Sequence, residues 1–302
     1  MYIHGMKFIL FCISLFMCIR LVAQPAQLKL FPQGTIFHQN IPYANDTLQK
    51  HLLDIYLPPS TTANLPLVVW IHGGAWMLND KYADMSYMKH TVKSFIDSGY
   101  ALASINYRYS TDSVFPAQIR DCNAAIQFLY KHAGEYHIDK NKIALIGFSA
   151  GGHLASLLAL SNNNHVKEFS AVAVDFTIKT CLDFYGPSDF IMLANNPDTA
   201  VNNMRNPVSL LLGAMAVDRP DLAMAASPVN YIDKRDPPFL IVQGEKDESV
   251  PSTQSKILSS RLTLSGVKND LIIVPNAPHY GEMFDADYIR TKVFEYLRIY
   301  LR

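Results

Sequence analysis

Short runs of apolar residues recur along most of the chain, separated by longer segments that read as helices. The continuous apolar run at residues 143–146, for example, suits a strand that is buried on both faces. Strands are expected at residues 35–43, 52–56, 67–71, 100–105, 143–146, 180–185, 239–242 and 271–274, and helices at 82–98, 116–133, 152–160, 251–265 and 285–302. Strands that alternate with helices at this spacing predict an α/β fold with a mostly parallel central sheet and helices on both faces.

This alternation breaks between residues 188 and 230. The segment is rich in Asn, Pro, Met and Ala and has only a weak helical pattern. We interpret it as a small helical insertion between consecutive strands, lying over the active site. The pattern leaves open whether the insertion acts as a lid or is a plain structural crossover. The chain has 302 residues, of which 49% are hydrophobic, and residues 24–302 are expected to form a single domain with a substantial core.

The first 23 residues have the pattern of a secretory signal peptide. Lys7 precedes an apolar run over residues 8–19, and Ala23 supplies a small residue at the end. The run is too short for a good membrane span, so no stable membrane insertion is expected, with an uncleaved anchor as the alternative. Cys18 lacks the small preceding residues that a lipidation site needs. We therefore expect a secreted or periplasmic protein.

Charge and cysteine usage exclude several kinds of partner and site. Lys+Arg and Asp+Glu number 26 each, so no basic face is present to indicate a nucleic-acid partner. After the signal segment the chain keeps Cys122 on a predicted helix and Cys181 on a predicted buried strand. These two cysteines lack metal-ligand spacing, and we expect them to be buried free thiols rather than a disulfide.

The most informative chemical motif is the G-x-S-x-G pentapeptide at residues 147–151. It follows a predicted strand and opens a predicted helix, and this context is typical of a nucleophile elbow. Gly147 and Gly151 are needed there because side chains in so tight a turn would clash with the strand and the helix. The motif therefore predicts Ser149 as a nucleophile, placed at a helix N-terminus that favours developing negative charge.

A second glycine-containing turn, His72-Gly73-Gly74, follows the predicted central strand at residues 67–71. A glycine-rich turn there could also bind phosphate, but the G-K-[ST] sequence that a P-loop requires is absent. An H-G-G segment upstream of G-x-S-x-G is instead the oxyanion-hole signature of lipases and esterases. We expect the N–H groups of Gly73, Gly74 and Ala150 to bind the oxyanion and His72 to be structural.

A serine hydroxyl needs a base, and α/β hydrolases carry their catalytic residues in the order Ser, Asp or Glu, His. This order selects Ser149, Asp247 and His279, and the last two follow the ends of predicted strands, where a parallel sheet places reactive groups. Ser149 would attack a carbonyl, His279 would carry the proton, and Asp247 would orient the imidazole. The other candidates for the acid and the base are Glu245, Glu248, His153 and His165.

Taken together, these motifs resemble the bifunctional feruloyl and acetylxylan esterase family of α/β hydrolases, within the hormone-sensitive-lipase-like esterases. The resemblance runs from about Leu52 to the C-terminus. The segments that carry it are residues 53–58, 72–76, 106–108, 121, 147–155, 227–228, 237–239, 244–251 and 279.

The resemblance implies a single α/β-hydrolase domain that hydrolyses carboxylic esters, often acetyl or feruloyl groups on plant polysaccharides, without a metal or an organic cofactor. It carries over onto Ser149, Asp247 and His279 as the triad and onto the oxyanion-hole residues given above. Two departures concern Ala75, where many relatives have a third glycine, and residues 177–180, which look like extra residues before the strand that contains Cys181.

These residues are compatible with other activities on the same fold. An arylformamidase, a lipase and a serine peptidase use the same triad, although this chain is too short to hold the propeller domain that such peptidases usually carry. A non-catalytic binding protein is a further alternative, but such proteins typically lose the serine or the histidine. Fold alone does not give the substrate.

Overall fold

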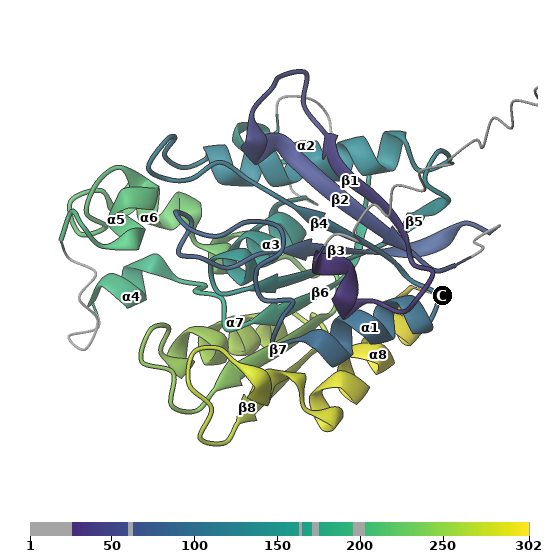
Figure 1. Cartoon of the computed structure of the whole chain (residues 1–302). Helices are drawn as coiled ribbons and strands as arrows, with labels where there is room; N and C mark the ends of the chain where they lie inside the picture. Colours follow the sequence, from purple (N-terminus) through teal and green to yellow (C-terminus); the bar gives the residue numbers. More distant parts are fainter. Residues whose placement is uncertain (1–25, 60–62, 163–164, 171–174, 196–202, 302) are drawn as a thin grey trace, which may run out of the picture.

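The structure is a computed structural model that describes residues 26–59, 63–162, 165–170, 175–195 and 203–301 (Figure 1). The predicted signal segment, residues 1–23, lies outside the described residues. Within these ranges one sheet is built from eight strands: β1 Ile36–Pro42, β2 Leu52–Leu57, β3 Leu65–Ile71, β4 Ala101–Ile105, β5 Ile138–Phe148, β6 Ile178–Phe184, β7 Phe239–Gly244 and β8 Asn269–Val274.

The strand order across the sheet is β1-β2-β4-β3-β5-β6-β7-β8. The β1–β2 and β2–β4 pairs are antiparallel, and every pair from β4–β3 to β7–β8 is parallel. The carboxyl ends of β3, β5, β6, β7 and β8 therefore meet at one edge of the sheet. Connections that leave this edge are placed to form a common site.

Helices cover both faces of the sheet, as predicted. The longer ones are α1 Lys89–Asp97, α2 Ala117–Lys131, α3 Ala150–Asn162, α7 Ser252–Leu264 and α8 Asp287–Tyr300. Short 3-10 helices are η1 Ala26–Leu30, η2 Gln49–His51, η3 Lys167–Phe169, η4 Pro228–Tyr231 and η5 Glu282–Asp285. Val68 and Trp70 of β3 pack in the core with α1 and α8, whereas Leu67, Val69 and Ile71 pack with α2, α3 and α7. Alternate residues of a strand point to opposite faces, so each face of β3 is buried under its own helical layer.

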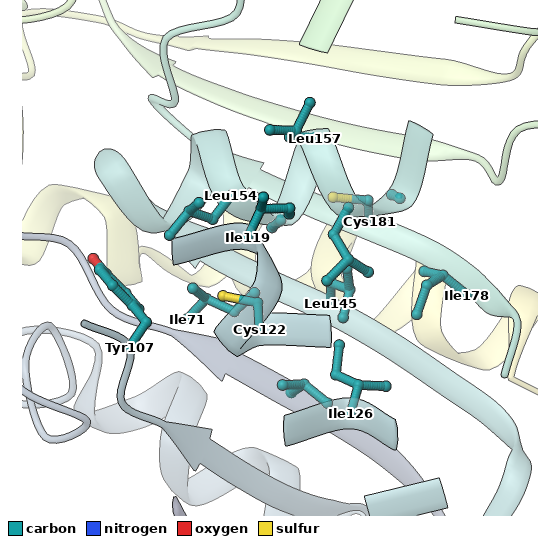
Figure 2. Packing of buried hydrophobic residues seen from close by; sticks show 14 of the residues in the cluster. Ile71, Tyr107, Ile119, Cys122, Ile126, Leu145, Leu154, Leu157, Ile178 and Cys181 are labelled. Carbon is teal, nitrogen blue, oxygen red and sulfur yellow. The ribbon is translucent and has the colours of Figure 1, made fainter. Parts of the chain in front are cut away.

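Figure 2 shows part of the core on the α2 and α3 face, including both cysteines of the described chain. Cys122 and Cys181 are buried free thiols, which confirms the prediction made for them. Burial raises the pKa of each thiol well above its ordinary value, because the charged thiolate loses its hydration. Both cysteines therefore behave as small apolar residues of the core.

The predicted insertion between β6 and β7 is present and helical. It contains α4 Phe190–Asn195, α5 Pro207–Leu212 and α6 Pro220–Ala226, which Figure 1 shows grouped at one end of the sheet, on the left. The side chain of Asn206 caps α5 by accepting a hydrogen bond from the Val208 N–H (2.9 Å), and Pro207 follows at the first helical position. The fold class, a mostly parallel sheet with helices on both faces and this insertion, is confirmed.

Two local predictions need correction. The helix expected at residues 82–98 begins only at Lys89, and Asp84 has a φ of 70°, a left-handed conformation that keeps this residue out of an α-helix. Residues 178–180, expected as an insertion before the strand, belong to β6 itself. The register shifts there, since Ile143 faces Ile178 while the next residue, Ala144, faces Thr180. This bulge lies at the amino end of β6, away from the carboxyl edge of the sheet.

Candidate active site

Ser149 lies on the sharp turn between β5 and α3 and has a φ of 53°. Few residues other than glycine adopt this backbone region, so the turn is strained. The chain closes so tightly that a Cβ on Gly147 would lie 2.1 Å from the Gly151 carbonyl oxygen, and a Cβ on Gly151 would lie 2.0 Å from that of Ile71. The two glycines of the motif are therefore required, and the predicted elbow is present.

The structure brings Ser149, His279 and Asp247 together from three different strand ends. His279 Nε2 lies 2.8 Å from Ser149 Oγ, and its Nδ1 lies 2.7 Å from Asp247 Oδ2. The serine follows β5, the aspartate follows β7 and the histidine follows β8. The arrangement lets the histidine accept the serine proton while the carboxylate holds the opposite ring nitrogen.

The Asp247 carboxylate is buried and held by four hydrogen-bond donors. Its Oδ1 accepts the N–H groups of Ser249 (2.9 Å) and Val250 (2.8 Å). Its Oδ2 accepts Gln243 Nε2 (2.8 Å) as well as the histidine. Gln243 is fixed in turn by Ser255, whose hydroxyl donates to Gln243 Oε1 (2.7 Å). This supporting role of Gln243 was not predicted, because nothing in the sequence marks a strand glutamine as the partner of the next turn.

The alternative acids and bases lie elsewhere. Glu245 and Glu248 are exposed, and Glu245 Oε2 accepts the Asn276 N–H (2.9 Å). His165 is exposed in the turn after α3. His153 is buried and lies between the Trp76 ring N–H, 3.2 Å from its Nδ1, and the Ala226 carbonyl oxygen, 2.8 Å from its Nε2. His153 thus links α3 to the glycine turn and to the insertion.

The glycine turn after β3 lies beside the serine, but its N–H groups differ in their partners. The Gly73 N–H, one of the predicted oxyanion donors, donates a hydrogen bond to Asp84 Oδ2 (2.7 Å). Gly74 follows at a φ of 122°, and Ala75 and Trp76 also have positive φ values of 52° and 58°. Ala75 therefore adopts a backbone conformation that glycine would adopt more easily.

Ala150 is the first residue of α3, where an N–H has no acceptor within the helix. Of the three predicted donors, the Gly73 N–H is thus already bonded to Asp84, and Gly74 and Ala150 remain the candidates for binding an oxyanion.

His72 is structural, as predicted. Its ring is buried and stacks on Tyr107 with a centroid distance of 4.3 Å, and its Nδ1 donates to the Gly73 carbonyl oxygen (2.7 Å). The Tyr107 hydroxyl donates to the His72 carbonyl oxygen (2.9 Å). Burial lowers the pKa of His72 to about 4, so the ring is neutral at neutral pH.

A pocket of about 670 Å³ opens over Ser149 and His279. One part of its lining comes from the glycine turn and the residues after it, including Trp76, Leu78 and Tyr87. Another part comes from the insertion, through Leu193, Pro207 and Val208. The insertion therefore forms one wall of the pocket, and residues 177–180 do not take part in its lining. Tyr280, next to His279, also lines the pocket and is 65% exposed.

A buried carboxyl group lies behind the elbow. Asp183 of β6 accepts hydrogen bonds from the Ser156 hydroxyl (2.5 Å) and the Gly186 N–H (2.9 Å). A Cβ on Gly152 would lie 2.5 Å from Asp183 Oδ1, so the carboxyl group is packed directly against the start of α3. Desolvation raises its pKa from 3.8 to about 6, and the two hydrogen bonds oppose this increase.

This carboxyl group gives a prediction for stability against pH. Between about pH 4 and pH 6 Asp183 is protonated in the folded chain and ionised in the unfolded chain, so its contribution to stability falls as the pH rises. Asp183→Asn can accept from Gly186 and donate to Ser156 without titrating. The free energy of unfolding of the variant, minus that of the wild type, should therefore increase by about 2 kcal/mol from pH 4 to pH 6 and level off near pH 7. Urea unfolding at pH 4, 5, 6 and 7 measures this difference, and a difference independent of pH would contradict the prediction.

Within the described ranges no helix is both long and apolar enough to cross a membrane. In the same part of the chain no group of three or more His, Cys, Asp or Glu side chains is arranged to hold a metal ion.

Comparison with known proteins gives consistent results. The family model BD-FAE matches residues 53–262. The chain is 32% identical to Esterase LipQ of Mycobacterium tuberculosis over 247 residues, which is 80% of this chain and 56% of that protein. It is 34% identical to the probable carboxylic ester hydrolase LipM of the same organism, over 77% of this chain and 53% of that protein. The chain thus spans about half the length of these curated relatives.

Solved structures with the same fold include a truncated carbohydrate esterase from gut microbiota. It superposes with a TM-score of 0.82 at 29% identity, covering 89% of this chain and 98% of that one. A bifunctional GH43-CE protein of Bacteroides eggerthii superposes with a TM-score of 0.80 at 33% identity, covering 88% of this chain and 35% of that one. Both comparisons extend over most of this chain.

Proposed function

The chain belongs to the BD-FAE family, and from this premise we propose that it is a serine carboxylic-ester hydrolase that removes acetyl or feruloyl groups from plant polysaccharides. The observation that carries the proposal is the hydrogen-bonded series from Ser149 through His279 to Asp247 at the base of a pocket. The relatives and structural neighbours that are esterases support the reaction class, and the two carbohydrate-esterase neighbours support the substrate class.

The reaction proceeds through an acyl-enzyme. Ser149 Oγ attacks the ester carbonyl carbon while its proton passes to His279 Nε2, and the carbonyl electron pair becomes an oxyanion held by the N–H groups of Gly74 and Ala150. His279 then gives the proton to the departing alcohol. In the second half of the reaction a water molecule attacks the acyl carbon while His279 takes its proton, and His279 returns this proton to Ser149 Oγ as the acid leaves. Asp247 keeps the Nδ1 proton of the ring in place and stabilises the imidazolium.

The two sides of the pocket take different parts of the substrate. The alcohol must leave on the side of His279, because this residue donates the proton to it. Tyr280 lies on that side, and its exposed ring offers a flat apolar surface suited to the face of a sugar. The acyl group then lies toward the glycine turn and the insertion, against Trp76, Leu193 and Val208.

Hydrolysis of a panel of esters tests this function. The panel contains p-nitrophenyl esters from acetate to octanoate, methyl ferulate and acetylated xylan, with a Ser149→Ala variant as the blank. We expect turnover of the acetate ester and of acetylated xylan or methyl ferulate, at rates that the blank lacks. Preference for octanoate would indicate a lipase. Turnover of amides alone would indicate an arylformamidase or a peptidase, and no turnover by a folded protein would favour a binding protein.

We also propose that residues 1–23 direct export to the periplasm or the medium, on the pattern of Lys7, the apolar run and Ala23. The mass of the protein recovered from its natural host gives the test. A mature chain that begins at Gln24 outside the cytoplasm supports export, and an intact N-terminus inside the cell contradicts it.

A further inference from the structure

Asp84 connects the glycine turn to the catalytic histidine through a series of close contacts. Its Oδ2 accepts the Gly73 N–H (2.7 Å), and its Oδ1 accepts the hydroxyl of Tyr87 (2.6 Å). The Tyr87 hydroxyl lies 2.8 Å from that of Tyr185, whose ring packs edge-on against His279 at a centroid distance of 5.0 Å. Asp84 also lines the pocket, although it belongs to no helix or strand.

The position of Gly73 governs the geometry of the site. A Cβ on this residue would lie 2.9 Å from the Phe148 carbonyl oxygen and 3.5 Å from Ser149 Cβ, so the turn lies directly against the nucleophile. The next N–H along the chain, that of Gly74, is a proposed oxyanion donor. A shift of Gly73 would therefore change the distance between this donor and the oxygen that becomes charged.

Electrostatics alone do not explain a carboxyl group in this place. A negative charge close to a developing oxyanion opposes the reaction, and burial raises the pKa of Asp84, which shows the cost of ionising it there. The two hydrogen bonds to Gly73 and Tyr87 partly offset this cost. Asp84 instead provides a fixed acceptor for the Gly73 N–H, because the Tyr87 hydroxyl holds the other oxygen of the carboxyl group.

We propose that Asp84 is the positioning residue of the oxyanion hole, which fixes the glycine turn by accepting the Gly73 N–H so that the Gly74 N–H meets the transition state. This inference rests on the proposed esterase function. Asp84 acts through the backbone and does not itself contact the reacting atoms. Its effect should therefore appear in the chemical step and in the binding of charged tetrahedral species, and much less in the binding of the substrate.

Two variants separate the hydrogen bond from the charge. Asp84→Gly removes the acceptor, and glycine tolerates the φ of 70° at this position. Asp84→Asn also tolerates this φ, and it can accept the Gly73 N–H with its oxygen while donating to Tyr87 with its nitrogen. A matched control is Asp80→Gly, because Asp80 is exposed in the same connection and caps only the local Tyr82 N–H (2.9 Å).

The readouts are kcat and KM for p-nitrophenyl acetate and inhibition by an alkyl trifluoromethyl ketone. Ser149 Oγ adds to the ketone carbon, the carbonyl electron pair becomes an oxyanion, and the serine proton passes to His279. We expect Asp84→Gly to lower kcat and weaken ketone inhibition by about 10- to 100-fold each, with KM changed less than about twofold. Asp84→Asn should recover most of both, and Asp80→Gly should match the wild type.

Hydrogen exchange at residues 72–76 gives a readout that does not depend on activity. Exchange there should be faster in Asp84→Gly than in the wild type or in Asp84→Asn, because the Gly73 N–H loses its acceptor. Unchanged exchange, a wild-type kcat in Asp84→Gly, a loss confined to KM, or equal loss in the glycine and asparagine variants would each overturn the proposal. A wild type that hydrolyses no ester, with faster exchange in Asp84→Gly, would instead refute the esterase function and leave Asp84 as the anchor of the turn.

Discussion

The Ser149→Ala variant should lose esterase activity by roughly 10⁵- to 10⁶-fold in kcat while it folds normally. The serine oxygen supplies the bond that forms in the first step, and no other hydroxyl group is shown to lie at the His279 Nε2 atom within the described chain. Residual hydrolysis would come from binding and from the oxyanion donors alone. Steady-state rates on p-nitrophenyl acetate, with thermal unfolding of the same samples, measure both halves of the prediction.

A serine away from the pocket supplies the control for this variant. Ser94 lies on α1, which covers the sheet face opposite α3, and Ser94→Ala should keep the wild-type rate. If Ser149→Ala retained more than about one part in a thousand of the wild-type kcat, the acyl-enzyme mechanism would fail, because even the residual catalysis of triad variants lies below that level.

Asp247→Asn should lower kcat by about 10⁴-fold with little change in KM, and it should also lower stability, because the asparagine nitrogen would face the Gln243 Nε2 donor. The asparagine nitrogen would face His279 Nδ1, which is a donor in the active tautomer, so the ring would be driven to place its proton on Nε2. That nitrogen could then no longer accept the proton of Ser149. The asparagine oxygen can still accept the Ser249 and Val250 N–H groups, and the turn should therefore keep its shape.

The neighbouring glutamates test whether this effect belongs to Asp247 alone. Glu248→Gln removes an exposed carboxyl group from the same turn, and Glu245→Gln keeps an acceptor for the Asn276 N–H. Both variants should retain kcat within about twofold, as surface substitutions outside a site usually do. A large loss of kcat in either glutamate variant, with a mild effect of Asp247→Asn, would show that this glutamate and not Asp247 is the acid of the triad.

The parts of the fold that follow from local pattern could be predicted from the sequence. Buried strands such as β3 and β7 read as continuous apolar runs, because both of their faces meet helices. The elbow was predictable because the need for glycine at positions 147 and 151, where a side chain would clash with the strand or the helix, can be recognised from the five-residue motif alone. The order of Ser149, Asp247 and His279 then placed three distant residues at one edge of a sheet whose mostly parallel arrangement was also predicted.

Features that depend on contacts distant in sequence could not be predicted in this way. Residues 82–88 have a helical pattern, yet Asp84 accepts the Gly73 N–H from a left-handed backbone conformation, and the helix begins only at Lys89. The same contact changed the expected role of Gly73 as an oxyanion donor. Gln243 appears in the sequence as one more residue of a buried strand, and only the folded chain shows that its amide supports Asp247.

His279 follows β8, the edge strand of the sheet, and it meets a serine that lies 130 residues earlier in the chain. A ribosome has therefore made all eight strands of the described sheet before the base can reach its nucleophile. Contacts of such long sequence separation form late and slowly, because loop closure must be completed first. A nascent or partly folded chain would thus remain inert toward esters. Hydrolytic activity consequently reports that the last strand has docked, and recovery of activity during refolding should mark the final assembly of the sheet.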